Sequence, residues 1–130
     1  MQQEEQNEED FEPVAPSPKA LLSSLQSKHY RFEYIESDEN IVFSGVAMKI
    51  SKIDTEYDEV TLAVKLDVKN DSDYADITAN FQGIDKDGFE VTSFSIDGRV
   101  KRGQCATITG KEEIDNISEF EEIVAWNIEH

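Results

Sequence analysis

Residues 59 to 70 carry the sequence feature that most constrains the fold, an unbroken alternation of apolar and mostly polar side chains. The apolar members are Val60, Leu62, Val64, Leu66 and Val68. A period of two is typical of a strand with one buried and one solvent-facing side, as found in antiparallel sheets. The sequence therefore predicts that this segment is a half-buried β-strand.

Five further segments of this character lie between Ile41 and the C-terminus, separated by turn residues. Strands are predicted at 41–53, 59–70, 74–85, 89–96, 104–111 and 120–129, with another extended segment at 29–36. Strands without intervening helices indicate a sandwich or barrel, and we expect an immunoglobulin-like antiparallel β-sandwich. In the segment 89–96 the apolar side chains change from odd-numbered to even-numbered positions, which predicts a β-bulge at Thr92 and Ser93. Ser17 and Pro18 predict the start of a short helix that ends near Lys28.

The same alternation predicts which side chains form the core. Trp126 is expected to be the most buried of them, and Cys105 to face outward while Ala106 and Ile108 face inward. The predicted core is Val46, Met48, Ile50, Leu62, Val64, Leu66, Val68, Ile77, Phe81, Phe94, Ile96, Ile108, Val124, Trp126 and Ile128.

The chain of 130 residues has the length of one ordinary domain. Residues 18–130 are predicted to form it, as a single β-sandwich with its N-terminal helix. Residues 1–17 contain six acidic side chains and no basic one, and they are interpreted as a disordered acidic tether. Either a solubilising linker or an acidic interaction arm fits this composition, and its removal is expected to leave thermal stability nearly unchanged.

The net charge of −17 disfavours nucleic acid and anionic lipid surfaces as partners, because most of the protein surface would repel them. No apolar stretch approaches the length of a membrane span, so membrane insertion is not expected. The first ten residues lack the basic and apolar regions of a signal peptide. A cytoplasmic protein and a mature extracytoplasmic segment both remain open.

Several short motifs resemble those of bacterial FxLYD-type immunoglobulin-like domains. They are Gly45, the run 66–73 (LDVKNDSD), Phe81 leading into 85–88 (DKDG), and Gly103-Gln104 before Ala106. The chain departs from that pattern at Arg102, where proline is usual, and at Gly83-Ile84, which replace a Leu-Tyr pair. The resemblance, over residues 41–129, implies a non-catalytic β-sandwich that commonly serves as an extracytoplasmic accessory module.

No residue is predicted to be catalytic, and no cofactor is expected. A hydrolytic enzyme would need a positioned base, for which the sequence offers His29 and the terminal His130. No obvious cation activates Cys105, which is expected to be a small strand residue and not a nucleophile. A calcium-stabilised structural domain is the alternative to a binding module. Its candidate ligands are Asn70, Asp71, Asp73 and Asp76.

Two surfaces are predicted to bind another protein chain or a second copy of this one. The first surface combines the edge of the strand 41–53 with a neighbouring aromatic face. The alternative role of the aromatic face is to cover the core. The residues of this first surface are Tyr30, Phe32, Tyr34, Phe43 and Ala47. The second is a basic loop that either pairs with the acidic turn at Asp71 and Asp73 or docks an acidic partner. It contains Arg99, Lys101 and Arg102.

Overall fold

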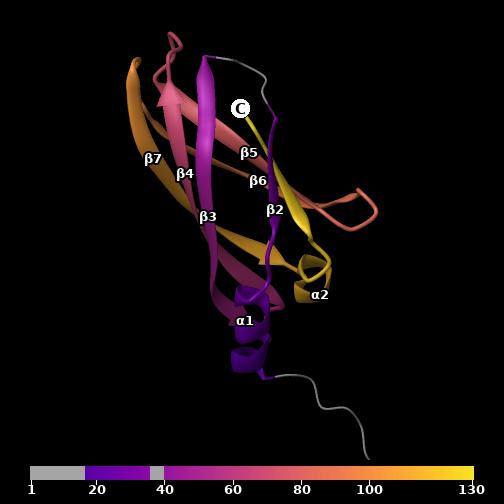
Figure 1. Cartoon of the computed structure of the whole chain (residues 1–130). Helices are drawn as coiled ribbons and strands as arrows, with labels where there is room; N and C mark the ends of the chain where they lie inside the picture. Colours follow the sequence, from indigo (N-terminus) through magenta and orange to yellow (C-terminus); the bar gives the residue numbers. More distant parts are fainter. Residues whose placement is uncertain (1–16, 36–39) are drawn as a thin grey trace, which may run out of the picture.

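The structure is a computed structural model that describes residues 17–35 and 40–130, and the expected tether at 1–16 lies outside the described residues. Two β-sheets face each other, with α1 and α2 near one end of the sandwich (Figure 1). The elements in chain order are α1 (Pro18–Gln26), β2 (Arg31–Ile35), β3 (Ile41–Asp54), β4 (Glu59–Asn70), β5 (Asp76–Ile84), β6 (Glu90–Arg99), β7 (Gln104–Asp115), α2 (Ile117–Phe120) and β8 (Ala125–Glu129).

The strand orders confirm an all-β sandwich. One sheet has the order β2-β8-β5-β6 and the other β3-β4-β7. The alternating segment 59–70 is β4, the centre of the three-stranded sheet, and its even-numbered side chains are buried as predicted. Ser17 caps α1 by accepting a hydrogen bond from the backbone N–H of Ala20 at 3.2 Å, as the sequence indicates.

Several details of the predicted strands are wrong, and β6 and β7 run on to Arg99 and Asp115, beyond the predicted ends at 96 and 111. The strand β2 runs parallel to β8, so the sandwich is not wholly antiparallel. The predicted last strand, 120–129, begins only at Ala125, because α2 and the turn after it occupy the preceding residues. The bulge in β6 lies at Val91 and not at Thr92 and Ser93, since Thr92 pairs with Gly83 while Glu90 pairs with Ile84.

The core lies between the sheets, and most of its predicted members are buried. Trp126 is fully buried, as expected, at 0% exposure. Val46, Met48 and Val124 are only partly buried. Ala106 pairs with the buried Val68 and so lies on the inner face as expected, although it is exposed on the edge strand β7, and Cys105 faces outward as expected. Buried hydrophobic side chains that were not predicted are Leu25, Ile41, Phe43, Ile53, Val60, Ala79, Val100, Ile114, Ile117, Phe120, Ile123 and Ala125.

Two glycines let the sheets approach closely where β6 faces β7. A Cβ atom on Gly98 would lie 2.5 Å from the Cγ2 of Ile108, and one on Gly110 would overlap the Cγ2 of Ile96. Each glycine therefore receives the branched side chain of the opposite strand. This reciprocal packing closes the sandwich along the β6–β7 side.

Candidate functional site

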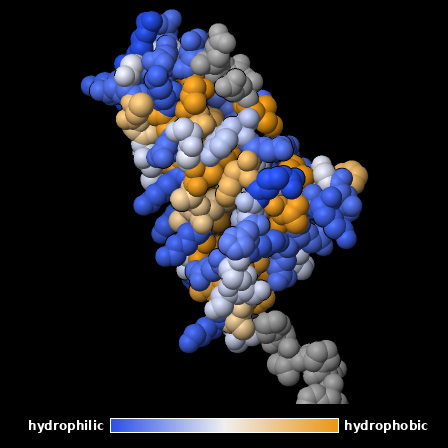
Figure 2. Space-filling model, viewed as in Figure 1, coloured by the Kyte–Doolittle hydropathy of each residue, from blue (hydrophilic) through white to orange (hydrophobic). Residues whose placement is uncertain are grey.

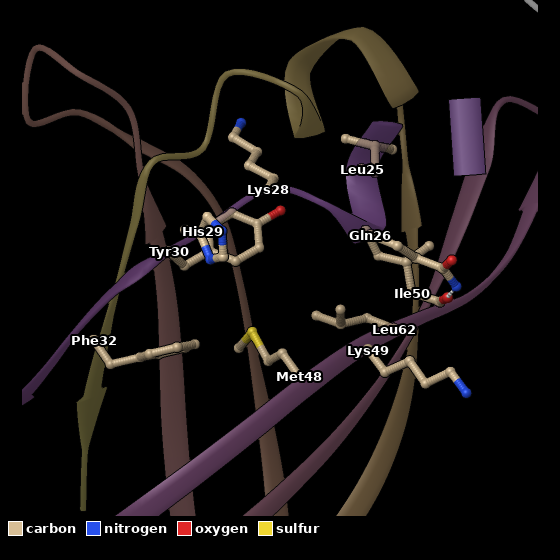
Figure 3. A pocket seen from close by; sticks show the side chains of 10 residues that line it. All are labelled: Leu25, Gln26, Lys28, His29, Tyr30, Phe32, Met48, Lys49, Ile50 and Leu62. Carbon is tan, nitrogen blue, oxygen red and sulfur yellow. Dashed lines mark hydrogen bonds between the residues drawn. The ribbon is translucent and has the colours of Figure 1, made fainter. Parts of the chain in front are cut away.

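The opposite side of the sandwich, where β2 faces β3, contains a cavity of about 470 Å³ (Figure 3). We call it the β2–β3 cleft. Phe32 from β2 and Met48 from β3 approach it from opposite strands, and Leu25 of α1 covers one end. The remaining lining residues are Gln26, Lys28, His29, Tyr30, Lys49, Ile50 and Leu62. Figure 2 shows hydrophobic surface in the middle of this view, bordered by hydrophilic residues.

At the cleft, β3 is an edge strand, and its outer side has no partner strand within the part of the chain that the structure describes. The Gln26 side chain donates a hydrogen bond to the Ile50 carbonyl at 2.7 Å, so the polar groups of Ile50 point away from β4. Backbone direction alternates along a regular strand, and Val46 and Met48 therefore also point their N–H and C=O groups outward. These two residues form an open strand edge, as the sequence predicted for this strand.

Ala47, an interaction candidate from the sequence, points its amide the other way. Ala47 pairs with Lys65 of β4. In β4, the carbonyl of Asn70 accepts a hydrogen bond from the Gly103 N–H, so the backbone polar groups of Asn70 point toward β7. Even-numbered β4 residues thus face β7 and odd-numbered ones face β3, so the Ala47–Lys65 pair is a hydrogen-bonded one. A proline at 47 would break the sheet and would not report on the edge.

One end of the open edge is covered, because Gln26 caps it at Ile50. Tyr34 of β2 lies close enough to Asp67 of β4 for the carboxylate charge to act on its phenol, and burial and this charge both raise the pKa of Tyr34. Beyond the Gln26 cap, the open edge runs along Met48 and Val46.

The aromatic candidates divide between the core, the cleft and the surface. Phe43 is buried at 9% exposure, so its prediction as a contact residue is wrong. Tyr30 and Phe32 are half-buried and line the cleft, whereas Tyr34 is 39% exposed. The aromatic stripe thus both covers the core and lines the opening.

Two buried polar atoms near the cleft have no hydrogen-bond partner among the described residues, the hydroxyl of Tyr30 and the Nε1 of Trp126. The two rings pack edge to face, with their centroids 6.2 Å apart. Burial raises the pKa of Tyr30 to about 12. An unsatisfied buried donor destabilises a fold by roughly 1–3 kcal/mol, so neither group improves stability by its polarity.

We expect Tyr30→Phe to leave the free energy of unfolding unchanged or to raise it slightly, because the lost hydroxyl is unpaired. The wild type should lose stability as pH rises from 10 to about 12, since the unfolded phenol ionises first and the buried one keeps its proton. The variant should lose less over that range. Urea unfolding at several pH values measures both effects, and marked destabilisation by Tyr30→Phe would show that the hydroxyl has a partner.

The predicted basic loop pairs with acidic residues of the neighbouring turn and strand. Arg102 contacts Asp73 at 2.7 Å and Arg99 contacts Asp76 at 3.0 Å, while Lys101 has no ion pair among the described residues. All four paired side chains are largely exposed, so each pair contributes only about 0–1 kcal/mol. The alternative role of this loop is to dock an acidic partner. In the structure, however, both of its arginines already pair with aspartates of the same chain.

The calcium candidates are not gathered around a common point. Asp73 and Asp76 each engage an arginine, and Asp71 lies 3.6 Å from Lys69. The side-chain oxygen of Asn70 accepts hydrogen bonds from the backbone and hydroxyl of Ser72. Within residues 17–35 and 40–130, no three His, Cys, Asp or Glu side chains lie close enough together to hold a metal ion.

One basic surface escaped the sequence analysis, which found clustered basic residues only in the loop 99–102. Lys49, Lys65 and Lys111 come from three different strands and meet on the outer side of the β3-β4-β7 sheet. We call these three residues the lysine face. Each is a single cation in a separate strand, so the strand register alone brings them together. The sequence signal that was available is that all three lysines occupy outward-facing positions in the alternating pattern of their strands.

No family model matches the chain, and no curated protein matches its sequence. Neither helix in the described part of the chain is long and apolar enough to cross a membrane.

Proposed function

We propose that the chain is a non-catalytic binding module that takes up a short extended segment of another protein chain along the open edge of β3. The observation that carries this proposal is the pair of outward-facing backbone groups at Val46 and Met48 beside the β2–β3 cleft. A strand added there would satisfy these groups by hydrogen bonds. Alternate side chains of the added segment would enter the apolar cleft.

The strand order supports an immunoglobulin-like arrangement for this module. In the immunoglobulin scheme, strands A, B and E share one sheet while C and F share the other, to which variable-type domains add C′. Here β3, β4 and β7 take the places of A, B and E, and β6, β5 and β8 those of C′, C and F. The place of G is taken by β2, which runs parallel to β8. The resemblance to FxLYD-type domains fits the same role of an accessory module.

We expect Met48→Pro to abolish partner binding while the fold is retained. Proline removes the outward N–H of residue 48 and leaves the hydrogen bonds between β3 and β4 intact, as proline on an edge strand allows. The partner is recovered by pull-down from a source extract with the wild type. Its affinity for each purified variant is then measured by calorimetric titration.

Met48→Ala is the matched control, since it removes the same side chain but keeps the backbone N–H. It should bind far better than Met48→Pro. Amide hydrogen exchange at Val46 and Met48 should also slow when the partner is bound. Equal binding by the proline and alanine variants, with unchanged exchange, would contradict strand addition at this edge.

A further inference from the structure

The lysine face concentrates positive charge in a chain with a large acidic excess. Lys49 and Lys111 flank Ala63 on the two neighbouring strands, and Lys65 lies one row further along β4. Strand spacing places Lys49 and Lys111 about 10 Å apart, and Lys65 about 7 Å along the strand from their row. These separations are comparable to the Debye length of about 8 Å at physiological salt, so the fields of the three charges overlap.

The side chain of none of these lysines makes an ion pair or hydrogen bond with any residue in 17–35 or 40–130. The chain has 29 acidic residues against 12 basic ones, so unpaired cations gathered on one face are unexpected. Asp67, the nearest acidic side chain along β4, accepts instead from the hydroxyl of Thr107 at 2.7 Å. The positive field of the face is therefore open to an external anion.

Between the lysines, the sheet surface forms a hollow of about 580 Å³. The outward side chains on its floor are short, because Ala47 and Ala63 stand between the lysines. A surface with a small-residue floor and a cationic rim fits an apolar side chain that is flanked by carboxylates.

We propose that the lysine face binds the chain's own acidic segment, residues 8–12. This segment reads Glu-Glu-Asp-Phe-Glu, a single aromatic ring enclosed by four carboxylates. Phe11 would enter the hollow while the neighbouring acidic side chains pair with the lysines. Of the two roles that the sequence left open for the N-terminal residues, this selects the acidic interaction arm.

The length of chain between the two surfaces permits this contact. The nine residues of α1 span about 14 Å, and Gln26 at its end is bonded to Ile50, the neighbour of Lys49. Ser17 therefore lies within roughly 20 Å of Ile50. The six residues from Phe11 to Ser17 extend up to about 20 Å, and the nine from Glu8 up to about 30 Å, so the segment reaches the lysine face from its Lys49 side.

Carbodiimide cross-linking of the full chain tests the proposal, because it joins carboxylates to lysines in direct contact. Equal amounts of ¹⁴N- and ¹⁵N-labelled protein are mixed, cross-linked, digested and analysed by mass spectrometry. We expect cross-links from residues 8–12 to Lys49, Lys65 or Lys111, within single molecules, and their loss in 1 M salt, where the Debye length falls to about 3 Å. Lys86 and Lys101 are exposed control lysines elsewhere on the surface.

A second measurement uses the native Cys105, which is exposed in β7 on the same side of the sheet as Lys111. A spin label on Cys105 should broaden the NMR signals of residues 8–12. The double variant Lys49→Gln/Lys111→Gln should relieve this broadening, and Lys86→Gln/Lys101→Gln should leave it unchanged. Cross-links that reach the control lysines as often, join ¹⁴N to ¹⁵N chains, or are absent would each overturn the proposal, as would broadening that both double variants preserve.

Discussion

Replacing Asn70 with aspartate is expected to destabilise the fold by about 3 kcal/mol or more at pH 7, although the two side chains have nearly the same shape. Asn70 is fully buried. Its amide nitrogen donates to the carbonyls of Tyr74 and Val100, and its oxygen accepts from Ser72. A carboxylate cannot donate, so two carbonyl oxygens would face a buried negative charge. Urea unfolding followed by Trp126 fluorescence measures the loss.

The loss should shrink at acidic pH. Burial and the facing carbonyls raise the pKa of the introduced carboxyl above its value in the unfolded chain, so the folded state takes up a proton first as pH falls. The destabilisation is thus fully present above the raised pKa and decreases as pH falls through it. The difference in unfolding free energy between variant and wild type, compared at pH 7 and at acidic pH, reports this directly.

Asn80→Asp is the matched control, since it introduces the same charge at an exposed position of β5. Asn80 accepts a hydrogen bond from the Ser95 hydroxyl at 2.6 Å, and a carboxylate can accept it equally well. We expect a change within about 0.5 kcal/mol there. Similar losses at positions 70 and 80 would show that added charge, and not the lost donors, dominates.

Asn70 also shows why its role could not be predicted from the sequence. In the run 66–73 it reads as a turn residue or a calcium ligand, because Asn and Asp serve both purposes. Its actual partners include Val100, thirty positions away in the chain. Such a contact depends on how the turn after β4 meets the loop after β6, which no local pattern encodes.

The strand alternation was informative wherever the backbone is regular. All of β4 was predicted correctly because β4 itself contains no bulge: its pairing with β7 is continuous, and the shifts in its pairing with β3 lie in β3. In β3, the register shifts between Phe43 and Gly45 and again between Ile50 and Lys52. The shift places both Phe43 and Ile50 in the core although they lie on opposite parities, which is why Phe43 was misread as a surface residue.

The turn before β8 carried a helical signal that was overlooked. Ile117, Phe120 and Ile123 are three residues apart and all buried, a spacing that suits a helical turn and not a strand. Asn116 begins α2 with a positive φ of 71° and accepts a hydrogen bond from the Glu119 N–H. The parallel pairing of β2 with β8, in contrast, had no local signal, because it joins the two ends of the described domain.

Trp126→Ala should be the most damaging single core substitution, with an expected loss of about 3–5 kcal/mol. Trp126 is fully buried, and its ring contacts Tyr30, Phe94 and Phe120 with centroids 5.5 to 6.4 Å apart. A Cβ on Gly83 would lie 3.1 Å from the ring, so the neighbouring strand is already shaped around it. Urea unfolding followed by far-ultraviolet circular dichroism measures the loss without relying on the deleted fluorophore.

Trp126→Phe separates ring packing from the indole N–H. The N–H has no partner among the described residues, so its removal should not add to the cost, and the phenyl ring keeps part of the buried contact. We expect a loss below half that of Trp126→Ala. In the wild type, Trp126 should show the blue-shifted emission of a buried indole. Emission typical of full water exposure, or equal losses in the two variants, would contradict the packing of β8 between β2 and β5. Because Tyr30 rests on this ring, loss of Trp126 should also disturb the β2–β3 cleft and speed amide exchange in β2.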